Sequence, residues 1–230
     1  MIEIRGLRFA YDDGTVALDG VDFSLAPGET VALLGANGSG KTTFVLHLNG
    51  LLIGEGAVSI CGLALEKRNL PAIRQKVGIV FQDSDDQLFM PTVLDDVAFG
   101  PLNHGCSPEE AGRRAVHALE QVGLADARNK APYHLSAGQK KRAAIAGILA
   151  MQPEILVFDE PTTFLDPPAQ GALAELLHGL PQAKILVTHD VEFADALATR
   201  AVFFERGRIV ASGAVGDIVR RFQWSVHQAR

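Results

Sequence analysis

The chain has 230 residues, of which 47% are hydrophobic, and a formal net charge of −6. This length and apolar content fit one large α/β domain, or a domain with a subdomain, and argue against disorder. The acidic balance argues against nucleic acid as the main ligand.

The two cysteines and the apolar runs exclude further classes. Cys61 and Cys106 lie far apart in no C-x-x-C arrangement, which argues against a zinc knuckle or a disulfide framework. No apolar run reaches the roughly 18–20 residues that span a bilayer. A strand pattern begins directly after Met1, so we expect no signal peptide.

The first thirty residues alternate apolar and polar side chains, interrupted by Asp12-Asp13-Gly14 and by Pro27-Gly28. This alternation predicts antiparallel strands joined by turns. Residues 56–62 are expected to add a strand to the same sheet. Tyr11 lies just before the first turn, where its ring could stack on an adenine, although a lone aromatic at a strand end is more often a packing residue.

Residues 35–42 read Gly-Ala-Asn-Gly-Ser-Gly-Lys-Thr, between the apolar run 30–34 and a helical pattern over 43–48. This is the G-x-x-x-x-G-K-[ST] spacing in its strand-loop-helix context. The glycines let backbone N–H groups point inward, and the helix N-terminus adds a partial positive charge. The pattern predicts a site for nucleotide phosphates, with Lys41 reaching the terminal phosphates and Thr42 as a ligand for Mg²⁺. A loop that merely turned the chain would need no Lys-Thr pair.

From Val77 onward, short apolar runs predict strands buried on both faces of a mostly parallel sheet. These runs are 77–81, 154–159, 184–188 and 201–204. Residues 83–135 are predicted to be helical and to form a subdomain that could pivot. Within them Ser107-Pro108-Glu109-Glu110 predicts a helix start with an N-cap, a first-turn proline and a capping-box glutamate. A hairpin over 201–212 and a short helix from about residue 215 follow.

The run ending in Asp159 and Glu160 places two carboxylates at the C-terminal end of a buried parallel strand, where α/β sheets bind ligands. Asp159 is expected to hold Mg²⁺ through its water shell. Glu160 is expected to act as a general base or to position the attacking water. Adjacent acids alone could equally be a solvated strand end. Together with Lys41 and Thr42 they predict a nucleoside triphosphatase.

Residues 135–142 read Leu-Ser-Ala-Gly-Gln-Lys-Lys-Arg and precede a helix predicted over 140–151. Ser136 is a candidate N-cap, and the N–H groups after it form a second anion site at a helix N-terminus. One nucleotide hardly needs two such sites within one subunit. We therefore infer that this loop closes on a nucleotide held by another subunit.

In order and separation these motifs resemble the ATP-binding cassette ATPases, over essentially the whole chain. Residues 35–42 match the phosphate loop of the family, residues 159–160 its acidic pair and residues 135–139 its signature loop. Gln82 matches the switch glutamine, residues 165–166 match the D-loop, and His189 matches the switch histidine. The resemblance implies a P-loop NTPase core with an antiparallel β subdomain and an inserted α-helical subdomain. It implies a single domain over 1–230, with core residues 1–82 and 152–230 and helical residues 83–151.

The resemblance also implies roles for individual residues in a head-to-tail dimer that sandwiches two ATP-Mg²⁺. ATP would contact Tyr11, Gly35, Asn37, Gly38, Ser39, Gly40, Lys41, Thr42, Thr43, Ser136, Gly138, Gln139 and Asp166. In this list Ser136 and Gly138 contact the nucleotide of the opposite subunit. The implied catalytic residues are Glu160, His189 and Gln82, and the implied Mg²⁺ ligands are Thr42, Gln82 and Asp159.

A closer resemblance lies in residues 81–89, Phe-Gln-Asp-Ser-Asp-Asp-Gln-Leu-Phe, and in 96–101, Asp-Val-Ala-Phe-Gly-Pro. These segments are similar to the energy-coupling-factor importers, the group whose ATPases serve cobalt and nickel uptake. The resemblance implies a peripheral protein on the cytoplasmic face of the membrane, bound to a transmembrane coupling protein and a substrate-capture membrane protein. The stretch after the switch glutamine lines the groove for a coupling helix, so 86–89 (Asp86, Gln87, Leu88 and Phe89) are contact candidates.

Three alternatives are weighed at this stage. A non-hydrolysing regulatory subunit is disfavoured because Asp159, Glu160 and His189 are all present. A vitamin such as biotin could replace the metal as cargo. A soluble cassette ATPase acting on nucleic acid or ribosomes would use the same motor, but such proteins usually carry a coiled-coil insertion, a second cassette or a basic surface. The chain also departs from the family at two positions: Ala137 replaces the first signature glycine, and Phe164 stands where the D-loop usually has a small residue. We expect activity to survive Ala137, and Phe164 to alter signalling between the two sites.

Overall fold

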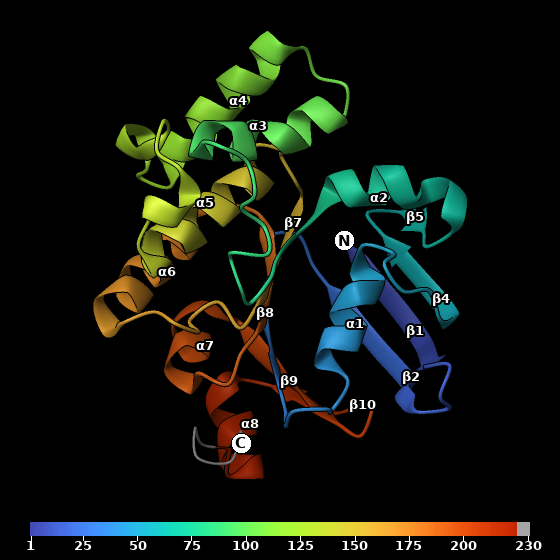
Figure 1. Ribbon diagram of the computed structural model, residues 1–230. Helices are drawn as coiled ribbons and strands as arrows, with labels where there is room; N and C mark the ends of the chain where they lie inside the picture. Colours follow the sequence, from blue (N-terminus) through green and yellow to red (C-terminus); the bar gives the residue numbers. More distant parts are fainter. Residues whose placement is uncertain (225–230) are drawn as a thin grey trace.

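The computed structural model describes residues 1–224 and contains two sheets (Figure 1). The first sheet is antiparallel, with strand order β2-β1-β4-β5, and confirms the predicted N-terminal strands. Its strands are β1 (Ile2–Ala10), β2 (Val16–Leu25), β4 (Glu55–Ile60) and β5 (Leu63–Ala64). Apolar side chains of β1 and β2 are buried on one face because they alternate with polar ones along each strand.

The second sheet has strand order β10-β9-β3-β8-β7-β6 and lies at the centre of the molecule. Its strands are β3 (Thr30–Leu34), β6 (Val77–Val80), β7 (Ile155–Asp159), β8 (Ala183–Val187), β9 (Arg200–Glu205) and β10 (Arg208–Gly213). All neighbouring pairs are parallel except the β9–β10 hairpin. Every residue of β3, β6 and β8 is buried, as predicted for strands covered on both faces.

Helices cover both faces of this sheet. The core helices are α1 (Lys41–Leu48), α2 (Leu70–Lys76), α6 (Pro167–Gly179), α7 (Val191–Leu197) and α8 (Val215–Phe222). Short 3₁₀ turns are η1 (Lys67–Asn69), η2 (Ala125–Ala127) and η3 (Pro132–His134). The sequence patterns described above do not predict α2, α6 or α7. No helix within residues 1–224 is long and apolar enough to cross a membrane.

The inserted segment forms a helical layer at the upper left of Figure 1, made of α3 (Val93–Asn103), α4 (Pro108–Gln121) and α5 (Ala137–Leu149). Helix α5 begins three residues before the predicted start because its N-terminus is doubly capped. The Ser136 hydroxyl accepts from the Gln139 N–H at 3.3 Å, and the Gln139 side chain accepts from the Ser136 N–H at 3.0 Å.

The capping box predicted at the start of α4 forms only in half. The Ser107 hydroxyl accepts from the Glu110 N–H at 3.2 Å, as an N-cap does. The Glu110 carboxylate does not bind the main-chain N–H of Ser107; instead it binds Arg114 at 2.7 Å and also pairs with Arg113. Two arginines one turn ahead therefore compete successfully for the carboxylate that we expected at the N-cap.

Strand β7 divides the core between the two subdomains. Leu156 and Phe158 pack with the helical layer, whereas Ile155 and Val157 pack with α1 and the antiparallel sheet. A third apolar cluster joins α8 and Trp224 to β9. The arrangement fixes the carboxyl ends of β3, β8 and β7, which are adjacent strands, at one edge of the sheet, and the predicted site residues follow these three ends.

Candidate functional site

A cleft of about 1080 Å³ opens over the phosphate loop, which we define as residues 35–42. The predicted site residues that line it are Tyr11, Asn37, Gly38, Gly40, Lys41, Thr42, Thr43, Gln82, Asp159, Glu160 and His189. They come from α1, from the end of β7 and from the loops that follow β1, β3, β6, β7 and β8. Gly35 and Ser39 lie outside the lining, and Ser39 is buried. The fold thus gathers most of the predicted site into one cavity.

Two glycines of the phosphate loop are required by close backbone approach. A Cβ at Gly35 would lie 2.3 Å from the Phe204 carbonyl oxygen, and one at Gly40 would lie 2.6 Å from the Ala17 carbonyl oxygen. Both have positive φ, of 139° and 107°. Because a side chain at either position would collide with rigid main chain, these glycines shape the loop as well as exposing its N–H groups.

Lys41 is buried inside this loop. Its ammonium donates to the carbonyl oxygens of Gly35 at 2.6 Å and Ala36 at 3.0 Å. Burial lowers the pKa of Lys41, and the carboxylates of Glu160 and Asp159 oppose that shift. The ammonium is therefore held within the phosphate loop, where the negative charge of nucleotide phosphates would stabilise its protonated form.

Thr42 and Asp159 form the candidate metal site. The Thr42 hydroxyl lies 3.4 Å from Oδ2 of Asp159. Burial raises the pKa of Asp159, and the neighbouring Glu160 raises it further, whereas Thr42, Lys41 and His189 lower it. A hydroxyl and a carboxylate are ligands that Mg²⁺ accepts, and a carboxylate short of positive charge favours a cation. These two residues therefore fit Mg²⁺, while Gln82 lines the same cleft with an exposed side chain.

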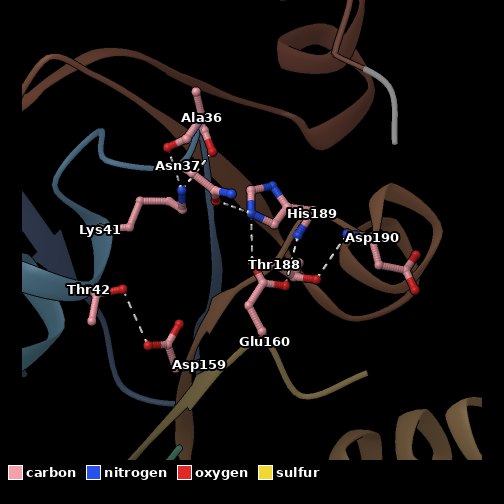
Figure 2. A network of polar contacts seen from close by, with 10 residues as sticks. Ala36, Asn37, Lys41, Thr42, Asp159, Glu160, Thr188, His189 and Asp190 are labelled. Carbon is pink, nitrogen blue, oxygen red and sulfur yellow. Dashed lines mark hydrogen bonds and ion pairs between the residues drawn. The ribbon is translucent and has the colours of Figure 1, made fainter. Parts of the chain in front are cut away.

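Glu160 and His189 both line the cleft, and Figure 2 shows their side chains directed toward one another. The His189 Nε2 lies 3.0 Å from Oε1 of Glu160 and 3.0 Å from Oδ1 of Asn37. The His189 main-chain N–H donates to the other Glu160 oxygen at 3.2 Å. Residues predicted separately from three segments thus form one polar network beside the phosphate loop.

Tyr11 lines the outer part of the cleft and is 42% exposed. Its hydroxyl is hydrogen-bonded to the Thr43 hydroxyl at 2.9 Å, and its ring meets the edge of Phe9 with centroids 5.1 Å apart. These contacts fix the position of the ring relative to the phosphate loop. Our two interpretations of Tyr11 are compatible, because the residue both packs and reaches the cavity.

The signature loop, residues 135–139, contributes no residue to the lining of this cleft. Ser136, Gly138 and Gln139 line a separate cavity of about 300 Å³ together with Phe164 and Asp166. Asp166 caps α6 by accepting from the Ala169 N–H at 2.9 Å. Phe164 has a φ of 66° and is 73% exposed. The described chain therefore holds its predicted phosphate contacts in two distinct places.

A groove of about 430 Å³ runs between the helical layer and the core. Gln87, Leu88 and Phe89 line it, as predicted, but Asp86 does not. Phe89 is 62% exposed and meets the edge of Phe99 with centroids 5.0 Å apart. Gln87 has a structural role as well, because its amide accepts from the Phe81 N–H at 3.0 Å and donates to the Ile79 carbonyl at 3.2 Å.

Two residues beside the site carried no sequence signal that we used. Lys141 is 2% exposed, and its ammonium donates to the carbonyl oxygens of Phe81 at 3.2 Å and Gln82 at 2.7 Å. Trp224 lines the cleft next to His189. A lysine in a basic run and an aromatic beyond the last predicted helix look like ordinary surface and packing residues, so only their tertiary contacts reveal them.

Relatives of known sequence resemble the chain over nearly its full length. Residues 18–163, more than half of the chain, match the family model described as ABC transporter. A putative ABC transporter ATP-binding protein of Streptomyces avermitilis is 52% identical over 219 residues, covering 95% of this chain and 84% of the relative. The energy-coupling factor transporter ATP-binding protein EcfA of Methanosphaera stadtmanae is 49% identical over 224 residues, covering 95% and 81%.

Solved structures of ABC transporter ATP-binding proteins also resemble the chain over nearly its full length. The structure of cbiO1 from Clostridium perfringens, part of the ABC transporter complex cbiONQ, has a TM-score of 0.87 at 34% identity, covering 96% of this chain and 91% of that one. The dimeric ATP-binding cassette MJ0796, in a post-hydrolysis state bound to ADP and Pi, has a TM-score of 0.83 at 29% identity, covering 94% and 99%. The P-loop NTPase fold and the family resemblance read from the motifs are thereby confirmed. The chain belongs to the ABC transporter family and is an ATPase of its energy-coupling-factor type.

Proposed function

We propose that this ATPase is the motor subunit of an energy-coupling-factor importer that works as a head-to-tail dimer on the cytoplasmic face of the membrane. One subunit would hold ATP on its phosphate loop, and the signature loop of the other would close on the same nucleotide. The separation of the two cavities within one chain supports this proposal, because the signature loop does not line the cleft of its own subunit. The likeness to a dimeric cassette bound to ADP and Pi supports it further.

Each residue of the cleft has a distinct task in the proposed reaction. Lys41 and the N–H groups of the phosphate loop bind and orient the polyphosphate, and Tyr11 stacks on the adenine. Glu160 orients the attacking water and accepts its proton, and His189 and Gln82 line the reacting end of the cleft. Thr42 and Asp159, with Gln82, would hold Mg²⁺, which neutralises charge on the phosphate oxygens when it is bound.

The network of Glu160, His189 and Asn37 is the observation that carries this mechanism. It brings the candidate base to a 3.0 Å contact with the histidine, which in turn reaches the phosphate loop. Mutation of Glu160 to glutamine preserves shape and hydrogen bonding but removes the base. Because a positioned general base contributes about 10²–10⁴-fold in rate, we expect kcat to fall by that factor while ATP still binds.

Steady-state phosphate release and sedimentation with ATP test this expectation. Glu160→Gln should accumulate an ATP-bound dimer, since ATP closes the interface and hydrolysis no longer reopens it. Glu175→Gln is the matched control, because it makes the same charge change at an exposed position on α6, outside the cleft. Unchanged turnover of Glu160→Gln would contradict the role of Glu160.

We further propose that the groove lined by residues 87–89 receives a helix of a transmembrane coupling protein. The exposed aromatic pair of Phe89 and Phe99 supports this proposal, because apolar surface of this kind is stabilised by burial against a partner. The groove also lies beside the switch glutamine, since Phe81 lines it and Gln82 follows directly. Movement of a helix in the groove could thus reach the cleft, and a substrate-capture membrane protein would complete the importer.

The proposed cargo is cobalt or nickel, with a vitamin such as biotin as the alternative. The sequence resemblance in residues 81–101 supports the metal. Among residues 1–224 there is no group of three or more His, Cys, Asp or Glu that could hold a metal ion, so cargo selection is assigned to the capture protein. Uptake of labelled cobalt, nickel and biotin by the reconstituted complex distinguishes these cargoes, and uptake of biotin alone would reject the metal.

A further inference from the structure

The C-terminal end of the described chain returns to the cleft and places an indole against His189. The rings of His189 and Trp224 are stacked, with centroids 5.9 Å apart and planes inclined by 30°. Trp224 is the only tryptophan in the sequence and is 6% exposed. Its main-chain N–H donates to the Val219 carbonyl at 3.0 Å, its ring meets Phe203 edge-on at 5.4 Å, and its indole Nε1 is buried without a hydrogen-bond partner among residues 1–224. The indole is therefore held firmly by α8 and β9.

The imidazole of His189 is constrained very differently on its two sides. Its Nε2 lies within hydrogen-bond distance of Glu160 and Asn37. Its Nδ1 is buried and has no hydrogen-bond partner among residues 1–224. A histidine whose Nε2 must face a reacting group is commonly oriented by a hydrogen bond at Nδ1. Because that bond is missing here, another contact has to hold the ring on this side.

We propose that Trp224 is a positioning residue for His189. Its indole face packs against the imidazole and disfavours rotation about the side-chain torsions, so that Nε2 stays directed at Glu160 and the phosphate loop. Trp224 acts through His189 and is not itself a catalytic residue. This inference rests on the proposed role of His189 in hydrolysis.

The test compares ATP hydrolysis by the full chain and its variants. We expect Trp224→Ala to lower kcat by about 10- to 100-fold with little change in KM, because a misplaced catalytic group loses rate while the phosphate loop still binds ATP. Trp224→Phe should recover most of the lost rate, since phenylalanine also presents an aromatic face. Phe222→Ala is the matched control: Phe222 stacks on Phe203 at 3.9 Å in the same segment but does not line the cleft.

A double-mutant cycle separates positioning from general structural support. Single-turnover measurements resolve the slow rates of His189→Ala, and in that background Trp224→Ala should cause no further loss. Equal losses in Trp224→Ala and Phe222→Ala, or an undiminished loss in the His189→Ala background, would overturn the inference and leave the role of His189 intact. Wild-type turnover of His189→Ala would instead overturn the role proposed for His189, and the inference with it.

Discussion

His47 is a fully buried histidine on α1, directly behind the phosphate loop. Its Nδ1 donates to the Thr43 carbonyl at 2.7 Å, and its ring meets the edge of Phe9. Its Nε2 is buried without a hydrogen-bond partner in residues 1–224. Protonation would place an unpaired charge there, so burial lowers the pKa of His47. The residue packs in the core of the molecule.

This lowered pKa predicts a loss of stability in mild acid. In the unfolded chain His47 has the ordinary histidine pKa of about 6.5, so it binds a proton at a pH where the buried His47 of the folded chain stays neutral. The free energy of unfolding therefore falls as the pH drops from about 7 to 5. Each tenfold difference in proton affinity between the two states is worth about 1.4 kcal/mol. Urea unfolding at several pH values should show a weaker pH dependence for His47→Gln than for wild type. His178→Gln, at an exposed position on α6, should keep the full dependence.

Helix α5 links the signature loop to the switch glutamine through Lys141. The ammonium is buried and bonds the carbonyl oxygens of Phe81 and Gln82, so the start of α5 and the end of β6 are tied together. Burial lowers the pKa of Lys141, and Asp83 and Asp159 oppose the shift. Movement of the signature loop would therefore be transmitted to Gln82, on the wall of the cleft.

Lys141→Met keeps the length and burial of this side chain but removes both bonds. Charge-assisted hydrogen bonds contribute about 1.5–3 kcal/mol, so we expect kcat to fall about tenfold or more, with faster hydrogen exchange in residues 81–88. Lys140→Met is the control, because the neighbouring Lys140 forms an ion pair with the exposed Asp85 that is worth only about 0–1 kcal/mol. Identical behaviour of the two variants would argue against a link through Lys141.

The whole molecule presents two working surfaces on either side of this link. The nucleotide cleft lies at the carboxyl edge of the central sheet, and the groove lined by residues 87–89 lies between the core and the helical layer. Both include residues that follow β6. We therefore propose that a change in one surface reaches the other through the segment that follows β6.

Phe89→Asp should impair binding at the groove while leaving ATP binding in the cleft intact. A charge at this exposed aromatic would oppose burial against a membrane partner, so we expect loss of co-purification with the transmembrane protein and loss of transport. ATP binding to the purified chain should remain as in wild type. Leu102→Asp, exposed on the same helical layer but outside the groove, is the matched control. Retained assembly of Phe89→Asp would remove the groove from the proposed interface.

Features that depend on neighbouring residues can be predicted from the sequence. The phosphate loop is one contiguous motif whose glycines directly precede a helix. The apolar runs predict buried strands because the signal for each strand lies within the run itself. The caps at Ser107 and Ser136 follow the same logic, although the path of the Glu110 carboxylate depended on which arginine it could reach.

Contacts between distant segments depend on the order of strands in the sheet and on helix packing, which the sequence patterns do not reveal. His189 reaches Asn37 because β8 lies beside β3 in the sheet, an order that no periodicity encodes. Lys141 and Trp224 join the site only because α5 packs at the end of β6 and α8 packs on β9. Helices α2, α6 and α7 escaped prediction, since such weakly patterned segments are stabilised mainly by packing on the sheet. Interactions between neighbouring residues therefore specify the phosphate loop, and packing between distant segments specifies which side chains surround it.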